Sequence, residues 1–241
     1  MLVPEVQEEK WEALGEGVGL FTDAAHRFGE DALLLADFAR PRPDERCCDL
    51  GTGGGIIPFQ WLSQGANNVI DGIDLDSEAI ALARRSAALT ARERQLAFHL
   101  ADWRQLDRVL PAGEYGLTVC NPPYFPPGSG KVSREDAAAR ARHEPSPDTL
   151  SRLAEAAARL LKNGGRFCLC HRPERLCDVL TALRAAGLEP KCLRLVQRGE
   201  DRPPWLLLCE ARKGGRPGLK IMPSLLQREK AKKDMDKEAA P

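Results

Sequence analysis

Short apolar runs alternate with longer segments of helical spacing through the middle of the chain. The runs have the length and content of buried strands, and the longer segments carry helix caps and apolar faces. This alternation predicts an α/β fold with a doubly wound, Rossmann-like sheet that is mostly parallel, and the short connection between the last two strands predicts an antiparallel edge hairpin. We expect helices after the first, second, fourth and fifth strands, and strands at 47–50, 69–74, 96–101, 115–120, 166–170, 191–196 and 205–210.

Local residue types mark where two of the helices begin and end. Ser77 is predicted to cap the helix after the second strand, because a serine oxygen accepts hydrogen bonds from free backbone N–H groups at a helix start. The helix over 148–161 is predicted to end at Asn163-Gly164-Gly165, since glycine favours the backbone turn that stops a helix. The segment 126–147 before it is rich in Pro, Gly, Ser and charge, and we expect a mobile loop there.

The two ends of the chain lack the alternation. The first 22 residues contain a glycine-rich stretch typical of a loop or short hairpin, and a short helix is expected over 32–39, before two prolines. We interpret 1–44 as an extension that packs on the main domain, which spans 45–212, because 44 residues are too few for an independent domain. Residues 213–241 form a charged tail that is expected to be partly disordered.

Composition narrows the class of protein only a little. The chain has 35 basic and 35 acidic residues, a balance that neither indicates nor excludes a nucleic-acid partner. Most of the eight cysteines lie in apolar strand-like runs without a C-x-x-C pair, which favours reduced core thiols in a cytoplasmic protein over a disulfide framework or a metal site. No apolar run approaches the length of about 20 residues that a membrane span needs.

A glycine cluster follows the first predicted strand and precedes the first helix. Its pattern is D-x-G-x-G-x-G, and the dinucleotide pattern G-x-G-x-x-G fails because Ile56 stands at the third glycine position. An acid at the strand end repels a pyrophosphate but suits an amine-bearing cation, so S-adenosylmethionine is the expected ligand; a glycine-rich turn without a ligand is the alternative. The candidate cofactor contacts here are Asp49, Gly51, Thr52, Gly53 and Gly55.

Two further carboxylates follow the second and third predicted strands. Asp74 is placed to accept hydrogen bonds from both ribose hydroxyls of a nucleoside, with Asp76 as its rival for that role and a helix cap as the plain alternative. Asp102 is placed to accept from an adenine amino group, unless it only caps a surface turn. Trp103 is expected to flank the ring, although a core position fits it almost as well.

The fourth predicted strand ends in Asn121-Pro122-Pro123-Tyr124. Two prolines stop the strand ladder at once and hold the chain in a stiff, extended loop. An asparagine oxygen and a neighbouring proline carbonyl can accept both hydrogens of a planar NH2 group, and a tyrosine ring offers a face for stacking. The loop therefore predicts a site for an amino group conjugated to an aromatic or amide system, with a Pro-rich turn as the alternative.

Both motifs belong to the carboxyl ends of parallel strands, where open α/β sheets bind ligands. Together they resemble those of the class I S-adenosylmethionine-dependent methyltransferases of the Asn-Pro-Pro-Tyr type, and most of all the bacterial tRNA-Val adenine N6-methyltransferase family. The resemblance runs from about Leu14 to about Leu225 and includes Phe28-Gly-Glu-Asp31-Ala-Leu-Leu-Leu-Ala36, Asn121-Pro-Pro-Tyr-Phe125 with Ala141-Arg-His143-Glu144, and Lys213-Gly-Gly-Arg-Pro-Gly-Leu219. The family usually has Thr where Glu30 stands, and the sequence after Pro223 departs from its usual ending.

This resemblance implies an enzyme that methylates an exocyclic amine of RNA, adenine N6 in tRNA being favoured. The catalytic set is then Asn121, Pro122, Pro123 and Tyr124, with Phe125 as a further wall, and no metal or obligate protein partner is implied. An RNA substrate would bring phosphates near basic residues of the loop and tail, namely Arg134, Arg140, Arg142, His143, Arg212, Lys213, Arg216 and Lys220. The alternatives are glutamine N5-methylation of release factors, amino-methylation of ribosomal RNA, and a catalytically silent cofactor-binding subunit.

Overall fold

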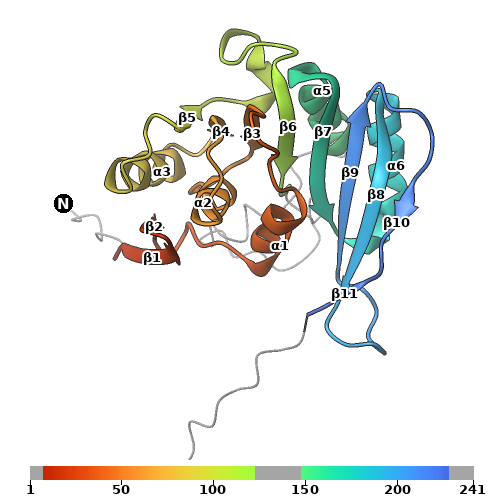
Figure 1. The fold of residues 1–241 in the computed structure, drawn as a ribbon, viewed down its shortest axis with the longest axis horizontal. Helices are drawn as coiled ribbons and strands as arrows, with labels where there is room; N and C mark the ends of the chain where they lie inside the picture. Colours follow the sequence, from red (N-terminus) through yellow and green to blue (C-terminus); the bar gives the residue numbers. More distant parts are fainter. Residues whose placement is uncertain (1–7, 123–147, 228–241) are drawn as a thin grey trace, which may run out of the picture.

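In the computed structural model, the described residues are 8–122 and 148–227. Figure 1 shows a central twisted sheet with helices on both faces, as the alternation predicts. The sheet path over these residues is β5-β4-β3-β6-β7-β9-β8-β10, and β11 also pairs with β8. The strands are β3 (Cys47–Leu50), β4 (Ile70–Asp74), β5 (Leu96–Leu100), β6 (Tyr115–Cys120), β7 (Leu161–His171), β8 (Leu188–Gln197), β9 (Leu206–Lys213), β10 (Lys220–Ile221) and β11 (Leu225–Leu226).

Strand direction follows the prediction, with two differences at the sheet edge. Within the described ranges, β9 alone runs antiparallel to its neighbours in this sheet, β7 and β8, and the other pairings of the sheet are parallel. The predicted hairpin is therefore present, but β10 and β11 extend the sheet beyond it along β8. The strand expected at 166–170 begins earlier, at Leu161, because Gly164 takes φ +77° and the chain forms an irregularity opposite Tyr115 rather than a helix end.

The two faces of the sheet carry separate apolar layers. One layer joins the sheet to α1 (Glu30–Phe38), α2 (Ile56–Ser63) and α3 (Ser77–Leu89). The other joins it to α5 (Thr149–Leu160), α6 (Leu176–Ala185) and the short turn η1 (Trp103–Arg108), and a second short turn, η2 (Pro173–Arg175), precedes α6. The apolar face predicted for α3, with Ile80, Ala83 and Ala87, is buried in the first layer. All eight cysteines are free thiols, and burial raises the pKa of the Cys209 thiol to about 12, so it stays protonated.

The N-terminal extension packs on the first of these layers. Its glycine-rich stretch forms the hairpin of β1 (Lys10–Gly15) and β2 (Val18–Thr22), as the sequence allows, and β2 lies against α2 and α3. The backbone N–H of Phe21 donates to the buried Ser86 hydroxyl on α3 at 2.8 Å. From α2, the Trp61 ring nitrogen donates to the Ala36 carbonyl of α1 at 2.9 Å. Apolar burial and buried hydrogen bonds therefore join the extension to the sheet's helices.

A buried arginine fastens the start of the main domain to the sheet. Arg166 on β7 has a side chain only 5 % exposed, and its guanidinium contacts Glu45 at 2.8 Å and Glu210 at 3.1 Å. It also donates to the Arg40 carbonyl at 3.1 Å. Glu45 precedes β3, Glu210 lies on β9, and Arg40 follows α1, so one side chain connects three elements.

We expect Arg166→Ala to lower the free energy of unfolding by about 3 kcal/mol, because it leaves two partly buried carboxylates without their cation. Urea unfolding followed by circular dichroism measures this difference. The matched control is Arg152→Ala, because the Arg152 side chain is 57 % exposed and pairs with Asp148 on the surface. That change is expected to cost less than about 1 kcal/mol. Equal losses in the two variants would contradict a structural role for the buried ion pairs.

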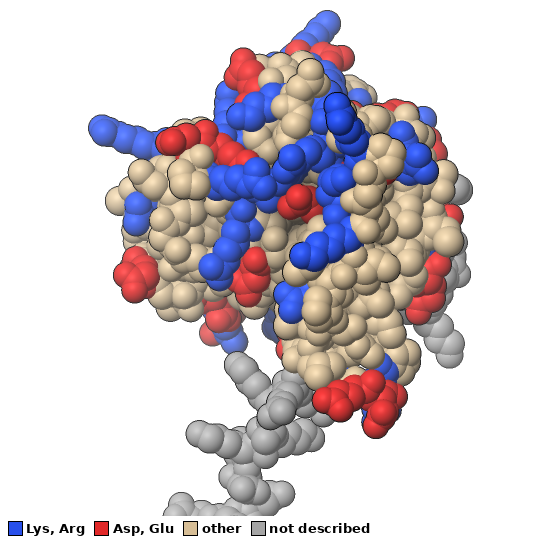
Figure 2. All heavy atoms as spheres, turned by 45° about the vertical axis from the view of Figure 1, so that its right-hand side comes forward, with Lys and Arg blue, Asp and Glu red and all other residues tan. Residues whose placement is uncertain are grey.

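Basic side chains gather on the side of the molecule that carries β8, β9 and β10. Figure 2 turns this side forward and shows Lys and Arg spread over its upper part, with only a few acidic groups among them. Lys220 lies opposite Cys192 in the pairing of β10 with β8, which brings the start of the charged tail onto the sheet. We call the surface in this view the basic face; the basic residues carried by β8, β9 and β10 are Lys191, Arg194, Arg212, Lys213 and Lys220.

Candidate cofactor and active site

The predicted site residues of four strands meet at one edge of the sheet. β3, β4, β5 and β6 are parallel neighbours, with Leu50 opposite Ile73 and Asp74 opposite Leu100. Their carboxyl ends therefore share an edge, which holds the glycine loop after β3, Asp74 at the end of β4, Asp102 after β5 and Asn121 after β6. This is the edge at which open α/β sheets bind ligands.

The glycine loop turns sharply from β3 into α2. The backbone N–H groups of Gly51 and Thr52 both donate to the Ile73 carbonyl, at 2.8 and 2.9 Å, which holds the loop against β4. Gly51 has φ +75° and Gly53 has φ +53°, a left-handed backbone that favours glycine, and a Cβ on either would meet open space. Gly55 is left-handed as well, at φ +89°, but a Cβ there would approach the rings of Phe59 and Phe98 to 3.0 Å. Gly55 is thus needed for packing, and a cofactor contact from it stays a prediction.

Asp49 at the end of β3 is the most deeply buried acid of the site, at 1 % exposed. Its Oδ2 accepts a hydrogen bond from the Thr52 hydroxyl at 2.8 Å. Its Oδ1 is buried without a hydrogen-bond partner among the described residues. Burial raises the pKa of Asp49 to about 7, the nearby charge of Asp74 adds to the rise, and the Thr52 hydrogen bond opposes it. A cationic ligand would satisfy the open oxygen and stabilise the ionised form.

Asp74 and its rival Asp76 have different partners. Asp74 lies at the end of β4, where its Oδ2 accepts from the Gly53 N–H at 2.7 Å and its Oδ1 from the Asp76 N–H at 3.0 Å. Asp76 instead caps α3, accepting from the backbone N–H groups of Glu78 and Ala79 at 2.9 and 3.1 Å. The prediction that Ser77 caps this helix is therefore wrong, because the aspartate before it fills the capping position. Asp76 is thus engaged as a helix cap, and the ribose role of Asp74 stays a prediction.

Asp102 caps a turn and Trp103 packs against the core, which are the alternatives to a cofactor role that the sequence left open. Asp102 caps the turn η1 and accepts from the Arg104 N–H at 2.9 Å, and its carboxylate pairs with the Arg104 guanidinium at 2.7 Å. The hydrogen bond from Arg104 lowers the pKa of Asp102. Trp103 is half-buried and packs against the second apolar layer. An adenine amino group would share the Asp102 carboxylate with Arg104, a partner that was not predicted from the sequence. The cofactor roles of Asp102 and Trp103 stay predictions.

Asn121 follows β6 directly and is half-buried, and the following Pro122 is buried. The Cys170 thiol of the neighbouring strand β7 donates to the Asn121 side-chain oxygen at 3.0 Å. Cys170 is fully buried, so its thiol is a partner of the amide oxygen that is shielded from solvent. From the sequence, Cys170 was predicted only to lie in the core, and this contact was not predicted.

Several predicted site residues lie outside the described residues, namely Pro123, Tyr124, Phe125, Arg134, Arg140, Arg142 and His143.

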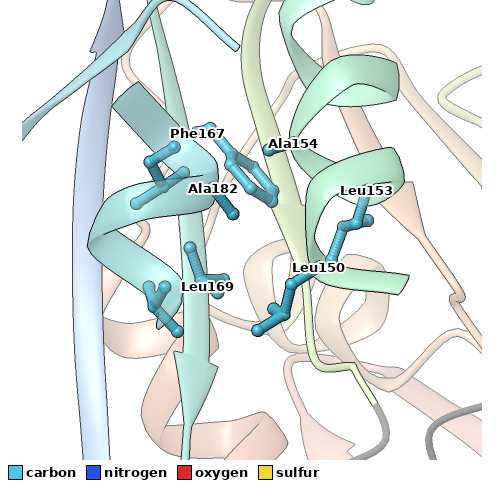
Figure 3. A pocket seen from close by; sticks show the side chains of 8 residues that line it. Leu150, Leu153, Ala154, Phe167, Leu169 and Ala182 are labelled. Carbon is cyan, nitrogen blue, oxygen red and sulfur yellow. The ribbon is translucent and has the colours of Figure 1, made fainter. Parts of the chain in front are cut away.

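An enclosed gap elsewhere in the molecule does not belong to this site. Figure 3 shows it between α5, β7 and α6, and its volume is only about 10 Å³. That space holds at most one water, and its apolar lining offers a water no hydrogen-bond partner. The gap is therefore a packing feature of the second apolar layer. Its lining side chains are Leu150, Leu153, Ala154, Phe167, Leu169, Val179, Ala182 and Leu183.

Comparison with known proteins agrees with the fold and the site. The strand order and the D-x-G-x-G-x-G loop define a class I methyltransferase, and a family profile described as a methyltransferase domain matches residues 41–212. A tRNA1(Val) (adenine(37)-N6)-methyltransferase of Tolumonas auensis is 32 % identical over 200 residues, which cover 78 % of each chain. One of the same name from Dickeya chrysanthemi is 29 % identical, over 79 % of this chain and 74 % of the relative. The chain belongs to this methyltransferase family.

Solved structures support the fold alone, since their sequences are distant. A predicted O-methyltransferase from Agrobacterium tumefaciens superposes with a TM-score of 0.65 at 20 % identity, covering 83 % of this chain and 89 % of that one. TrmN from Thermus thermophilus superposes with a TM-score of 0.53 at 23 % identity, covering 76 % of this chain and 48 % of that one.

The residues at the sheet edge fit S-adenosylmethionine, the cofactor of this class. Open space lies beside Gly51 and Gly53, and the buried Oδ1 of Asp49 lacks a partner in the described part of the chain. Within residues 8–122 and 148–227, no group of three or more His, Cys, Asp or Glu side chains is arranged to hold a metal ion. In the same ranges no helix is both long and apolar enough to span a membrane.

Proposed function

We propose that the chain transfers a methyl group from S-adenosylmethionine to the N6 atom of an adenine in tRNA. The observation that carries the proposal is the Asn121 amide, which is held at the same sheet edge as the glycine loop of a methyltransferase fold. The names of the relatives, tRNA1(Val) (adenine(37)-N6)-methyltransferase, support adenine N6 and tRNA as the substrate.

The cofactor is held by groups on three strand ends. Asp49 binds the ammonium group of the cofactor through its carboxylate oxygen Oδ1, which has no partner among the described residues. The glycine loop lets the cofactor lie close to the protein backbone. Asp74 accepts from the ribose hydroxyls, while Asp102 and Trp103 bind the adenine ring. S-adenosylmethionine supplies a methyl group on a sulfonium, which makes the methyl carbon electrophilic.

Asn121 and Pro122 act on the amine that receives the methyl group. An adenine amino group is a poor nucleophile, because its lone pair is delocalised into the ring. The Asn121 side-chain oxygen and the Pro122 carbonyl accept its two hydrogens, which aims the nitrogen lone pair at the methyl carbon. Orientation of this kind supplies roughly 7–11 kcal/mol of a barrier in well-positioned systems. The amine proton is lost after transfer, so the reaction needs no side chain of matched pKa.

The target base has to leave its stack to reach this edge of the sheet, which suits an unpaired nucleotide of an RNA loop. The basic face provides the electrostatic attraction that a phosphate backbone requires, although the chain as a whole carries no net charge. A local basic surface of this kind is typical of RNA-binding enzymes.

Transfer of label to unmodified tRNA tests the proposal. Purified protein is incubated with methyl-labelled S-adenosylmethionine and tRNA transcripts, and the RNA is digested to nucleosides. We expect the label in N6-methyladenosine and transfer that weakens steeply as salt is raised. Label in another nucleoside would overturn the adenine assignment but keep the reaction class. Label in a release factor, with none in tRNA, would favour the glutamine alternative.

A further inference from the structure

A histidine of the N-terminal extension reaches the cofactor edge. His26 lies between β2 and α1 with its side chain 10 % exposed, and both carboxylate oxygens of Asp23 lie 2.9 Å from its Nδ1. Asp23 itself is fixed, since its Oδ1 accepts from the backbone N–H groups of Ala25 and His26 at 2.8 and 2.7 Å. The opposite ring nitrogen, Nε2, lies 3.2 Å from the Asp76 carboxylate. One ring therefore bridges two acids from different parts of the chain.

The acid on the far side of this bridge is connected to the predicted ribose site. The Asp76 backbone N–H donates to Asp74 Oδ1 at 3.0 Å, and Asp74 Oδ2 accepts from the Gly53 N–H at 2.7 Å. A continuous path of hydrogen bonds thus runs from Asp23 through His26, Asp76 and Asp74 to the glycine loop. The extension also borders that loop by its backbone, because the Phe21 carbonyl lies 3.9 Å from where a Cβ of Gly54 would be.

The charges along this path favour a protonated ring. Burial alone would lower the pKa of His26, but the hydrogen bonds and charges of Asp23 and Asp76 outweigh it and raise the pKa. The pKa of Asp76 is lowered in turn, since its hydrogen bonds from Ala79 and His26 outweigh its burial. Only a doubly protonated imidazole can donate to both carboxylates at once. Asp23 and Asp76 are the charged groups that face the ring among the described residues.

We propose that His26 is a positioning residue of the cofactor site, which ties the N-terminal extension to Asp76 and thereby fixes Asp74 for binding the ribose. The proposal rests on the proposed function only in assigning Asp74 to the ribose. His26 itself touches neither cofactor nor substrate in this assignment; it acts through the short segment from Asp74 to Asp76. The extension is then part of the cofactor site rather than only a cover for α2 and α3.

Calorimetric titration with S-adenosylhomocysteine, without RNA, tests this inference. We expect His26→Ala to weaken binding by about tenfold, as the loss of a charge-assisted hydrogen bond does. The turnover number at saturating S-adenosylmethionine is expected to stay within about twofold, because the residues around the amine are untouched. The matched control is His99→Ala, since His99 pairs with Asp71 at 2.8 Å on the opposite face of the sheet. This control is expected to lose stability but not affinity.

The pH dependence separates a positioning role from a purely structural one. Because the His26 pKa is raised, its contribution is present at low pH and is lost as pH rises through that pKa. The ratio of dissociation constants between His26→Ala and the unmodified protein should therefore fall towards one at high pH. If His26→Ala folds poorly, Asp76→Asn is the second variant, since asparagine keeps the helix cap but removes the charge. Unchanged affinity in folded variants of both residues would overturn the inference, whereas failure of RNA methylation alone would overturn only the proposed function.

Discussion

Replacing Asn121 by alanine is expected to reduce methyl transfer by about a hundredfold to a thousandfold, with cofactor affinity changed less than about threefold. The side-chain oxygen of Asn121 is one of two acceptors that orient the amine, and alanine offers none. The effect belongs to the transition state, since the lone pair must point at the methyl carbon only when the bond forms. The turnover number should therefore fall much more than the Michaelis constant of either substrate rises.

Initial rates with tRNA and calorimetry with S-adenosylhomocysteine measure the two quantities separately. The matched control is Asn67→Ala, because Asn67 is an exposed asparagine before β4 and far along the chain from the predicted active loop. Loss of transfer in both variants would point to misfolding. Retention of more than about a tenth of the activity in Asn121→Ala would contradict its role as an amine acceptor, given the size expected for one such contact.

Cys170 offers a finer test of the same amide. Its thiol donates to the Asn121 oxygen, so Cys170→Ser keeps a donor and Cys170→Ala removes it. Activity close to normal in the serine variant and reduced turnover in the alanine variant would support a positioning role for this contact. Equal activity in the two variants would mean that the position of Asn121 does not depend on this contact.

The features predictable from the sequence are those that a local pattern encodes. Period and length located the parallel strands, and strand ends then located Asp49, Asp74, Asp102 and Asn121, because parallel strands bring their carboxyl ends to one edge. The two-residue strand β10 was not predicted, since so short a segment carries no period. The early start of β7 was missed because Gly164 is as typical of a strand irregularity as of a helix end.

Contacts between side chains from different elements were beyond the sequence analysis. Cys170 meets Asn121 because β7 is the neighbour of β6, and His26 meets Asp76 because the extension folds back over α3. Neither pairing has a fixed spacing in the chain, so no sequence motif predicts it. The pairing of Arg104 with Asp102 is different, because the two residues lie two positions apart in one turn. A contact between such close neighbours could have been predicted from the sequence.

Asp49→Asn is expected to become more stable relative to the unmodified protein as pH rises, until the effect levels off above about pH 7. The pKa of Asp49 is raised to about 7 in the folded chain, mainly by burial, from an unfolded value of 3.8. Between these values the folded state binds more protons than the unfolded state, so the stability of the unmodified protein falls with rising pH. Asparagine does not ionise there and removes this slope. We expect a relative gain of about 3 kcal/mol between pH 5 and pH 8.

The same substitution is expected to weaken the cofactor site, by at least about tenfold in S-adenosylhomocysteine affinity at pH 8. The buried Oδ1 of Asp49, which lacks a partner in the described part of the chain, is the proposed acceptor for the ammonium group. An asparagine carries no charge to attract that group. The buried acid thus costs stability in the free protein, and the bound cation offsets that cost.

Urea unfolding at pH 5 and pH 8, with calorimetry at pH 8, measures both effects in one pair of proteins. The matched control is Asp107→Asn, because the Asp107 side chain is 83 % exposed and pairs with Arg159 at the surface. Its stability difference is expected to be small at both pH values, since an exposed surface ion pair contributes little to stability. A pH-independent difference for Asp49→Asn would show that the carboxyl ionises freely in the fold. Unchanged affinity would remove Asp49 from the cofactor site and leave its open oxygen without a role in binding.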